Sequence, residues 1–139
     1  MGLIIQQPFG LMQPQMQTPT ALSQAAPVQN TYYDILPTTM NALIGQVSFQ
    51  VATTGETLQV RVIVDGQTLT ASQAVVAGTP YCVYLNLAGT LTITSTATNF
   101  NGGTTNVSLI PARSIRISVE KITANGTGTI TGSASYWKQ

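Results

Sequence analysis

The chain has 139 residues and a mass of 14.6 kDa, which corresponds to one domain. Only nine residues are charged, five basic and four acidic, where a usual composition would give roughly 35. The net charge of +1 excludes a general electrostatic attraction to nucleic acid or anionic membranes, both of which need clustered Lys and Arg. With no His and a single Cys, the sequence has neither an intrachain disulfide framework nor a cysteine-rich zinc site.

Hydrophobic residues make up 43% of the chain, which is enough to bury a core, so the scarcity of charge does not indicate disorder. We expect Thr, Ser, Asn, Gln and Gly to cover the surface, as is common on proteins that work outside cells. The first residues carry no Lys or Arg, and Gln6, Gln7 and Pro8 interrupt their apolar run, so no secretory signal is predicted. No segment is long enough to span a bilayer. A virion protein, synthesised in the host cytoplasm and released by lysis, reconciles these features.

Residues 1–30 are predicted to form an extended, Gln- and Pro-rich N-terminal arm. They hold four of the seven prolines, seven Gln and no charged side chain. Prolines at this spacing prevent a continuous helix and remove backbone donors. A disordered leader is one interpretation; an arm that lies in a groove of a neighbouring subunit is the other, because its apolar side chains are many for a free tail. The candidate subunit-contact residues in the arm are Ile4, Ile5, Phe9, Leu11 and Met12.

From residue 31 onward, apolar and polar residues alternate with the period of half-buried strands. The alternation is clear at Val47, Phe49 and Val51 and again across 58–65. Further strands are predicted at 67–76, 80–87, 90–98, 106–110, 114–122 and 128–137. Asp65-Gly66 has the chemistry of a two-residue type I′ hairpin turn, so the first three strands are predicted to form a meander. The expected fold is all-β, a single antiparallel β-sandwich or jelly roll of about eight strands over residues 31–139.

Three segments resemble small β-sandwich structural proteins of bacterial viruses. They are GETLQVRVIVDGQT at 55–68, SIRISV at 114–119 and GTITGSASY at 128–136. In those proteins a Val-Asp-Gly hairpin and a C-terminal strand that ends in an aromatic residue recur. The resemblance covers roughly residues 40–137 and implies a capsid, decoration or tail-appendage role.

The acidic residues are not placed for catalysis. Glu56 and Asp65 lie at opposite ends of one predicted strand, roughly 30 Å apart at about 3.3 Å per residue. Asp34 is expected to lie at the surface or to pair with Arg116 or Lys121. A Ser or Thr nucleophile would have no His as its base. We therefore predict no enzymatic activity, no cofactor and no metal site.

Four of the five cations, Arg113, Arg116, Lys121 and Lys138, lie in the last 27 residues. They could face packaged nucleic acid, or Arg116 and Glu120 could project into solvent from the same face of one strand. The second interpretation is favoured, since strong phosphate binding engages several cations at once. Nucleic acid is therefore not expected as a partner.

Two aromatic residues near the C-terminus, Tyr136 and Trp137, either close the end of the sandwich or anchor a subunit contact. With the arm residues they complete the predicted contact set. We expect a minor capsid, decoration or tail component of a bacteriophage that self-associates in threefold or fivefold rings and contacts neighbouring subunits through its arm. Other virion proteins are the further expected partners. The alternatives are an extracellular filament subunit that uses donor-strand exchange and a receptor- or carbohydrate-binding tail module.

Overall fold

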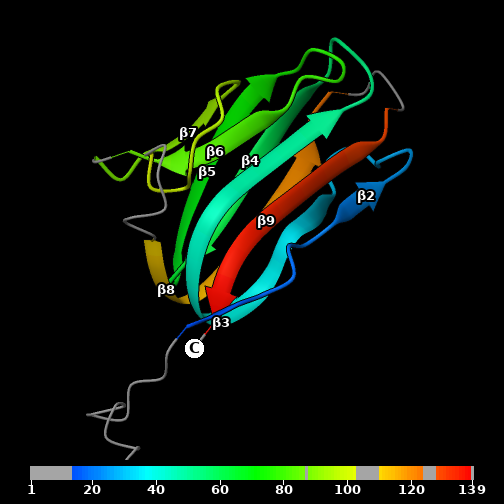
Figure 1. The fold of residues 1–139 in the computed structure, drawn as a ribbon. Coiled ribbons are helices and arrows are strands. Elements are labelled where there is room, and N and C mark those ends of the chain that lie inside the picture. The colour runs from blue at the N-terminus through cyan, green and yellow to red at the C-terminus, as the bar shows by residue number, and fades with distance from the viewer. Residues whose placement is uncertain (1–13, 87, 103–109, 124–127, 139) are drawn as a thin grey trace, which may run out of the picture.

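The structure is a computed structural model, and it describes residues 14–86, 88–102, 110–123 and 128–138. These residues form nine strands and no helix, in agreement with the predicted all-β fold (Figure 1). The strands are β1 (Gln15–Met16), β2 (Leu22–Gln24), β3 (Tyr32–Val51), β4 (Thr57–Val64), β5 (Gln67–Ala74), β6 (Tyr81–Leu85), β7 (Leu91–Thr94), β8 (Ile110–Lys121) and β9 (Ile130–Lys138). All pairings between these strands are antiparallel. The strand predicted at 106–110 falls outside the described residues except for Ile110, which begins β8.

The long strand β3 joins the two layers of the sandwich. Its first half pairs with β8, and its second half pairs with β9 and β6. One layer therefore contains the first half of β3 with β8, β4 and β5, and the other contains its second half with β9, β6 and β7. Asn41 has a positive φ of 53°, and the register with β9 shifts between Ile44 and Val47. Such irregularities let a strand bend sharply while it stays paired on both sides.

The core lies between these layers. On β4 and β8 every second side chain is fully buried, namely Leu58, Val60, Val62, Ile115, Ile117 and Val119. The other layer contributes Val47 and Phe49 from β3 and Ile130 from β9 to the same cluster. The Phe49 ring stacks on Tyr81 with 5.7 Å between centroids. Burial of side chains of this size contributes about 1.5–3 kcal/mol each, so the period-two pattern is sufficient to specify the two inner faces.

The Asp-Gly hairpin is confirmed and the predicted meander is wrong. Asp65 and Gly66 have φ values of 49° and 84°, and Val64 pairs with Gln67 across the turn. However, β8 lies between β3 and β4, so β3 and β4 are not neighbours. Residues 52–56 carry the chain from one layer to the other, and β4 then pairs with a strand that comes about fifty residues later. Local alternation identifies strands, but it does not identify their partners.

Candidate subunit-contact site

Of the predicted contact residues, the structure describes the two aromatic residues on β9. The five predicted in the arm, Ile4, Ile5, Phe9, Leu11 and Met12, lie outside the described residues. Tyr136 pairs with Ile44 of β3 and packs against the core cluster. Trp137 pairs with Leu43 of β3 on one side and with Met16 of β1 on the other. Both aromatic side chains are half-buried, so each combines an internal contact with exposed surface.

Trp137 lies across the bend of β3 because position 45 has no side chain. A Cβ atom at Gly45 would be 3.0 Å from the Trp137 ring and 2.6 Å from the Ser135 hydroxyl. That hydroxyl accepts the backbone N–H of Gln46 at 2.8 Å and so satisfies a donor at the register shift. Gly45, Ser135 and Trp137 together therefore hold the bend and the end of β9 in place.

The second half of the predicted arm lies along β9 of its own chain (Figure 1). Between β1 and β2, Gln17 N–H donates to the Tyr136 carbonyl at 3.0 Å, and Thr20 N–H donates to the Ala134 carbonyl at 3.1 Å. After β2, the N–H of Asn30 donates to the Lys121 carbonyl at 2.8 Å. Residues 15–24 thus cover the outer edge of β9, and Gln29 and Asn30 pair with Lys121 at the end of β8, so this part of the arm belongs to the chain's own sheet.

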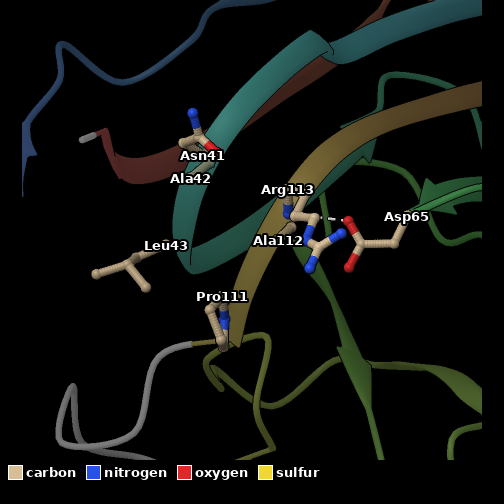
Figure 2. Close-up of a pocket in the computed structure, with 7 residues that line it drawn as sticks. All are labelled: Asn41, Ala42, Leu43, Asp65, Pro111, Ala112 and Arg113. Atoms are coloured by element: carbon tan, nitrogen blue, oxygen red, sulfur yellow. Dashed lines mark hydrogen bonds between the residues drawn. The ribbon is translucent and has the colours of Figure 1, made fainter.

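An open pocket of about 340 Å³ lies at the bend of β3, beside the ends of β4 and β9 (Figure 2). Its lining consists of Asn41, Ala42, Leu43, Asp65, Pro111, Ala112 and Arg113. One Asp65 carboxylate oxygen accepts the backbone N–H groups of Arg113 at 2.8 Å and Ser114 at 3.0 Å. Asp65 therefore both forms the hairpin turn and ties it to β8. The pocket combines the apolar surfaces of Leu43 and Pro111 with the exposed Arg113, which suits an apolar side chain beside a carbonyl or carboxylate.

The outer face of the first layer carries a paired charge cluster. Arg116 Nε donates to the Asp34 carboxylate at 2.8 Å, and the Ser118 hydroxyl donates to the same oxygen at 2.8 Å. The pairing of Asp34 with Arg116 is thus one of the two predicted. The hydrogen bond that Arg116 donates to Asp34, and then the negative charge of Asp34, raise the pKa of Arg116 above its usual range.

A second group on the same face surrounds Tyr32. The Arg61 guanidinium lies 3.8 Å from the Tyr32 ring centroid, a cation–π arrangement, and the Tyr32 hydroxyl donates to Gln59 Oε1 at 3.2 Å. Burial, and then the nearby Glu120 carboxylate, raise the pKa of the Tyr32 phenol above its ordinary value. The expectation that Glu120 projects into solvent is wrong, because only 9% of this residue is exposed beneath its neighbours.

A buried ion pair occupies the inner face at one end of the sandwich. Glu56 is 1% exposed and Lys121 is 4% exposed, and their charged atoms are 3.9 Å apart. Neither Glu56 carboxylate oxygen has a hydrogen-bond partner among the described residues. A carboxylate buried in this way depends on its countercharge, since desolvation of an unpaired charge costs several kcal/mol.

The net charge resides at the bend of β3. The six charges on Asp34, Glu56, Arg61, Arg116, Glu120 and Lys121 sum to zero. The remaining three, Asp65, Arg113 and Lys138, sum to +1, and all lie around Ala42, which pairs with both Ala112 and Lys138. Arg116 and Lys121 are paired with carboxylates, so of the four cations near the C-terminus only Arg113 and Lys138 lie at the bend of β3. Two neighbouring cations do not form an extended phosphate-binding surface.

Ser118–Lys121 and Ser135–Lys138 have the spacing of a Ser-x-x-Lys motif, but both pairs lie in strands, where residues three apart point to opposite faces. Within the described ranges, no three metal-ligating side chains come together. Cys82 is buried and pairs with Ser48 and Thr94, consistent with a packing role. The described part of the chain also contains no helix that could cross a membrane.

No protein-family model matches the sequence, and no curated protein is similar to it. Among solved structures, the chain is similar to that of the infectious bursal disease virus Gx strain, with 16% identity over 88% of this chain and a TM-score of 0.33. It is also similar to a crystal structure of a VP2 subviral particle of that virus, with 14% identity over 89% of this chain and a TM-score of 0.32. Both neighbours are structures of that virus or of its subviral particle, and the chain spans about a third of their length, 33% and 34%.

Proposed function

We propose that the protein is a virion structural protein of a bacteriophage, a minor capsid, decoration or tail component that self-assembles through its N-terminal arm. The observation that carries this proposal is that the second half of the arm pairs with β9 of its own chain. Residues 15–24 are attached to β9 of their own chain, so they already close that sheet edge. We assign the apolar residues that precede them to contacts with other molecules.

The energy available from this segment is large enough for assembly. Ile4, Ile5, Phe9 and Leu11 would each contribute about 1.5–3 kcal/mol on full burial against a partner. The segment precedes Gln15, which pairs with Lys138 next to the pocket at the bend of β3. An arm that binds a different surface on the next copy makes a head-to-tail contact, and such contacts close into rings when the rotation permits.

The surface chemistry supports dense packing of copies. Six of the nine charges cancel within the molecule, and the ion pairs from Arg116 to Asp34 and from Lys121 to Glu56 are internal. Copies of the chain therefore repel one another weakly at close range. The partners are other copies of this chain and other virion proteins, and the location is the virion.

Negative-stain electron microscopy of the purified chain tests this proposal. We expect closed rings, most plausibly threefold or fivefold, or a regular lattice. Isolated particles of 14.6 kDa at micromolar concentration would contradict it. Long unbranched filaments would instead favour the alternative of a filament subunit.

A further inference from the structure

Strand β5 ends the strand order of its layer and lies near β7 of the other layer, and no described strand pairs with its second edge. All eight of its residues pair with β4. The two-residue turn makes Val64 and Gln67 a hydrogen-bonded pair, so alternate residues from Gln67 onward bond to β4. The bond from Val75 N–H to the Glu56 carbonyl, 2.9 Å, continues the same phase. The backbone groups of Thr68, Thr70 and Ser72 therefore point away from β4, and no described residue bonds to them.

This edge has none of the features that protect exposed strands. Natural edge strands carry charges, prolines or bulges that discourage pairing with another chain. β5 has the sequence QTLTASQA, with no charge and no proline, and its register with β4 is continuous. By contrast, the outer edge of β9 is covered by β1, β2 and Thr20. In Figure 1, β2 lies outside β9 on the right, and β5 lies toward the opposite side of the molecule.

The core is also incompletely covered at β5. On β4, Val60 and Val62 are fully buried, with 0% exposure. Their cross-strand partners Ala71 and Leu69 share the same face and pack against the core, yet they are only half-buried. A further strand with apolar residues on its inner face would bury the exposed part of Leu69 and Ala71.

We propose that β5 receives residues 2–7 of a neighbouring copy as an added strand. This inference rests on the proposed function and identifies the surface to which the arm binds. The segment, GLIIQQ, has no proline, and Pro8 ends it. In an extended strand Leu3 and Ile5 share one face and extend the core beyond Leu69, while Ile4 lies on the other face with Thr70.

The dimensions fit this pairing. Six residues span roughly 20 Å, which is within the roughly 26 Å of the eight residues of β5, and residues 8–13 add about 20 Å of connecting chain. Within one copy, β1 and β5 stand at opposite ends of the order β1-β9-β3-β8-β4-β5, so an arm that filled its own β5 would have to cross the whole sheet. A neighbouring copy requires no such crossing. The other terminal strand, β7, has only four residues.

Disulfide trapping between two full-length variants tests the proposal. One variant carries Ile4→Cys and the other Thr70→Cys; the first is labelled with ¹⁵N, so mass spectrometry identifies mixed disulfides after mild oxidation. A parallel mixture of Ile4→Cys with Thr68→Cys detects the arm if its register on β5 is shifted by two residues. The control replaces Thr70→Cys with Gln46→Cys, an exposed position at the bend of β3. We expect mixed disulfides with β5 to exceed the control by about tenfold, because a bound arm raises the local concentration of the thiol.

Backbone chemistry provides the second measurement. Thr70→Pro removes an N–H that points away from β4, whereas Thr70→Val keeps this N–H and the branched side chain. We expect Thr70→Pro to weaken self-association by about fivefold or more while the fold persists, and Thr70→Val to leave it within about twofold. Normal association of the proline variant would overturn the proposal.

The trapping experiment separates the other outcomes. Dominant Thr70→Cys homodimers would mean that β5 pairs with β5 of a second copy, and a disulfide within one chain of the Ile4→Cys/Thr70→Cys double variant would mean that the arm folds back. Either result overturns docking of the neighbour's arm. Assembly without any trapped β5 contact would leave the proposed function intact and refute this site. Failure of the native chain to assemble would refute both.

Discussion

Thr20 and Ala134 are joined by two hydrogen bonds that close the edge of β9. The Thr20 N–H donates to the Ala134 carbonyl at 3.1 Å, and the Thr20 hydroxyl accepts the Ala134 N–H at 2.8 Å. Ala134 is fully buried, so without Thr20 its backbone groups would lose these partners at a site that water does not reach. Between β1 and β2, Thr20 alone thus satisfies the backbone groups of Ala134 that a paired strand would otherwise satisfy.

Removal of the Thr20 hydroxyl should therefore destabilise the fold. We expect Thr20→Val to lower the free energy of unfolding by about 1–2 kcal/mol, because it leaves the Ala134 N–H unsatisfied while the side-chain shape is kept. Thr20→Ser keeps the hydroxyl and should cost less. Urea denaturation followed by circular dichroism measures both, and equal stabilities of the valine and serine variants would show that the hydroxyl contributes nothing.

Replacement of Gly66 should act on the hairpin turn through backbone conformation. Its φ is 84°, and a Cβ built there meets no atom within 4 Å, so any cost of substitution comes from conformation and not from a clash. We expect Gly66→Val to destabilise the protein by roughly 1–3 kcal/mol, with Gly66→Ala less affected. An unchanged melting temperature for the valine variant would contradict the turn assignment.

Removing one partner of the buried Glu56–Lys121 ion pair should lower the free energy of unfolding more than replacing both partners with apolar residues. Lys121→Met leaves Glu56 buried without its countercharge, and we expect a loss of about 3–5 kcal/mol. The double variant Glu56→Leu/Lys121→Met should recover most of this loss, since two apolar side chains avoid the desolvation of two charges. Chemical denaturation of the single and double variants gives the coupling. Additive losses would mean that the two residues do not interact.

The sequence was informative about strands and turns because both are local properties. The alternation around Val60 and Ile117 and the Asp65-Gly66 turn predicted which residues face the core and where the chain reverses. The neighbour of β4 was not predictable in this way, because β8 is brought beside it by the long bend in β3 at Asn41. Contacts of this kind depend on the whole chain.

The candidate site was less accessible to sequence reasoning. Prolines at 14, 19 and 27 indicated an extended arm, but the pattern gave no sign that residues 15–24 bind β9. β1 and β2 have only two and three residues, too few for a periodic signal. The pairing of Glu56 with Lys121 was also not predictable from the sequence. Both residues are polar, and whether their side chains point inward and meet depends on the register between β4 and β8.

Alkaline pH should act on stability through Tyr32. Burial and Glu120 raise the pKa of this phenol in the folded state above its ordinary value near 10, so the folded protein keeps a proton that the unfolded chain releases. The stabilisation is therefore complete below about pH 10 and is lost as the pH rises through the folded pKa. Denaturation at about pH 9 and about pH 11 should show this loss in the native protein and a smaller one in Tyr32→Phe. The same pH dependence of stability in the native protein and in Tyr32→Phe would contradict this role of Tyr32.

Sedimentation velocity at micromolar concentration tests most directly whether residues 1–13 drive assembly. The native chain should sediment as a closed oligomer, and a variant with Ile4→Asn, Ile5→Asn and Phe9→Asn should sediment at 14.6 kDa with unchanged β-type circular dichroism. A variant with Gln6→Asn and Gln7→Asn, which alters the same segment without removing apolar side chains, should assemble normally. A native chain that sediments as a 14.6 kDa monomer, or a triple variant that assembles like the native chain, would contradict the account.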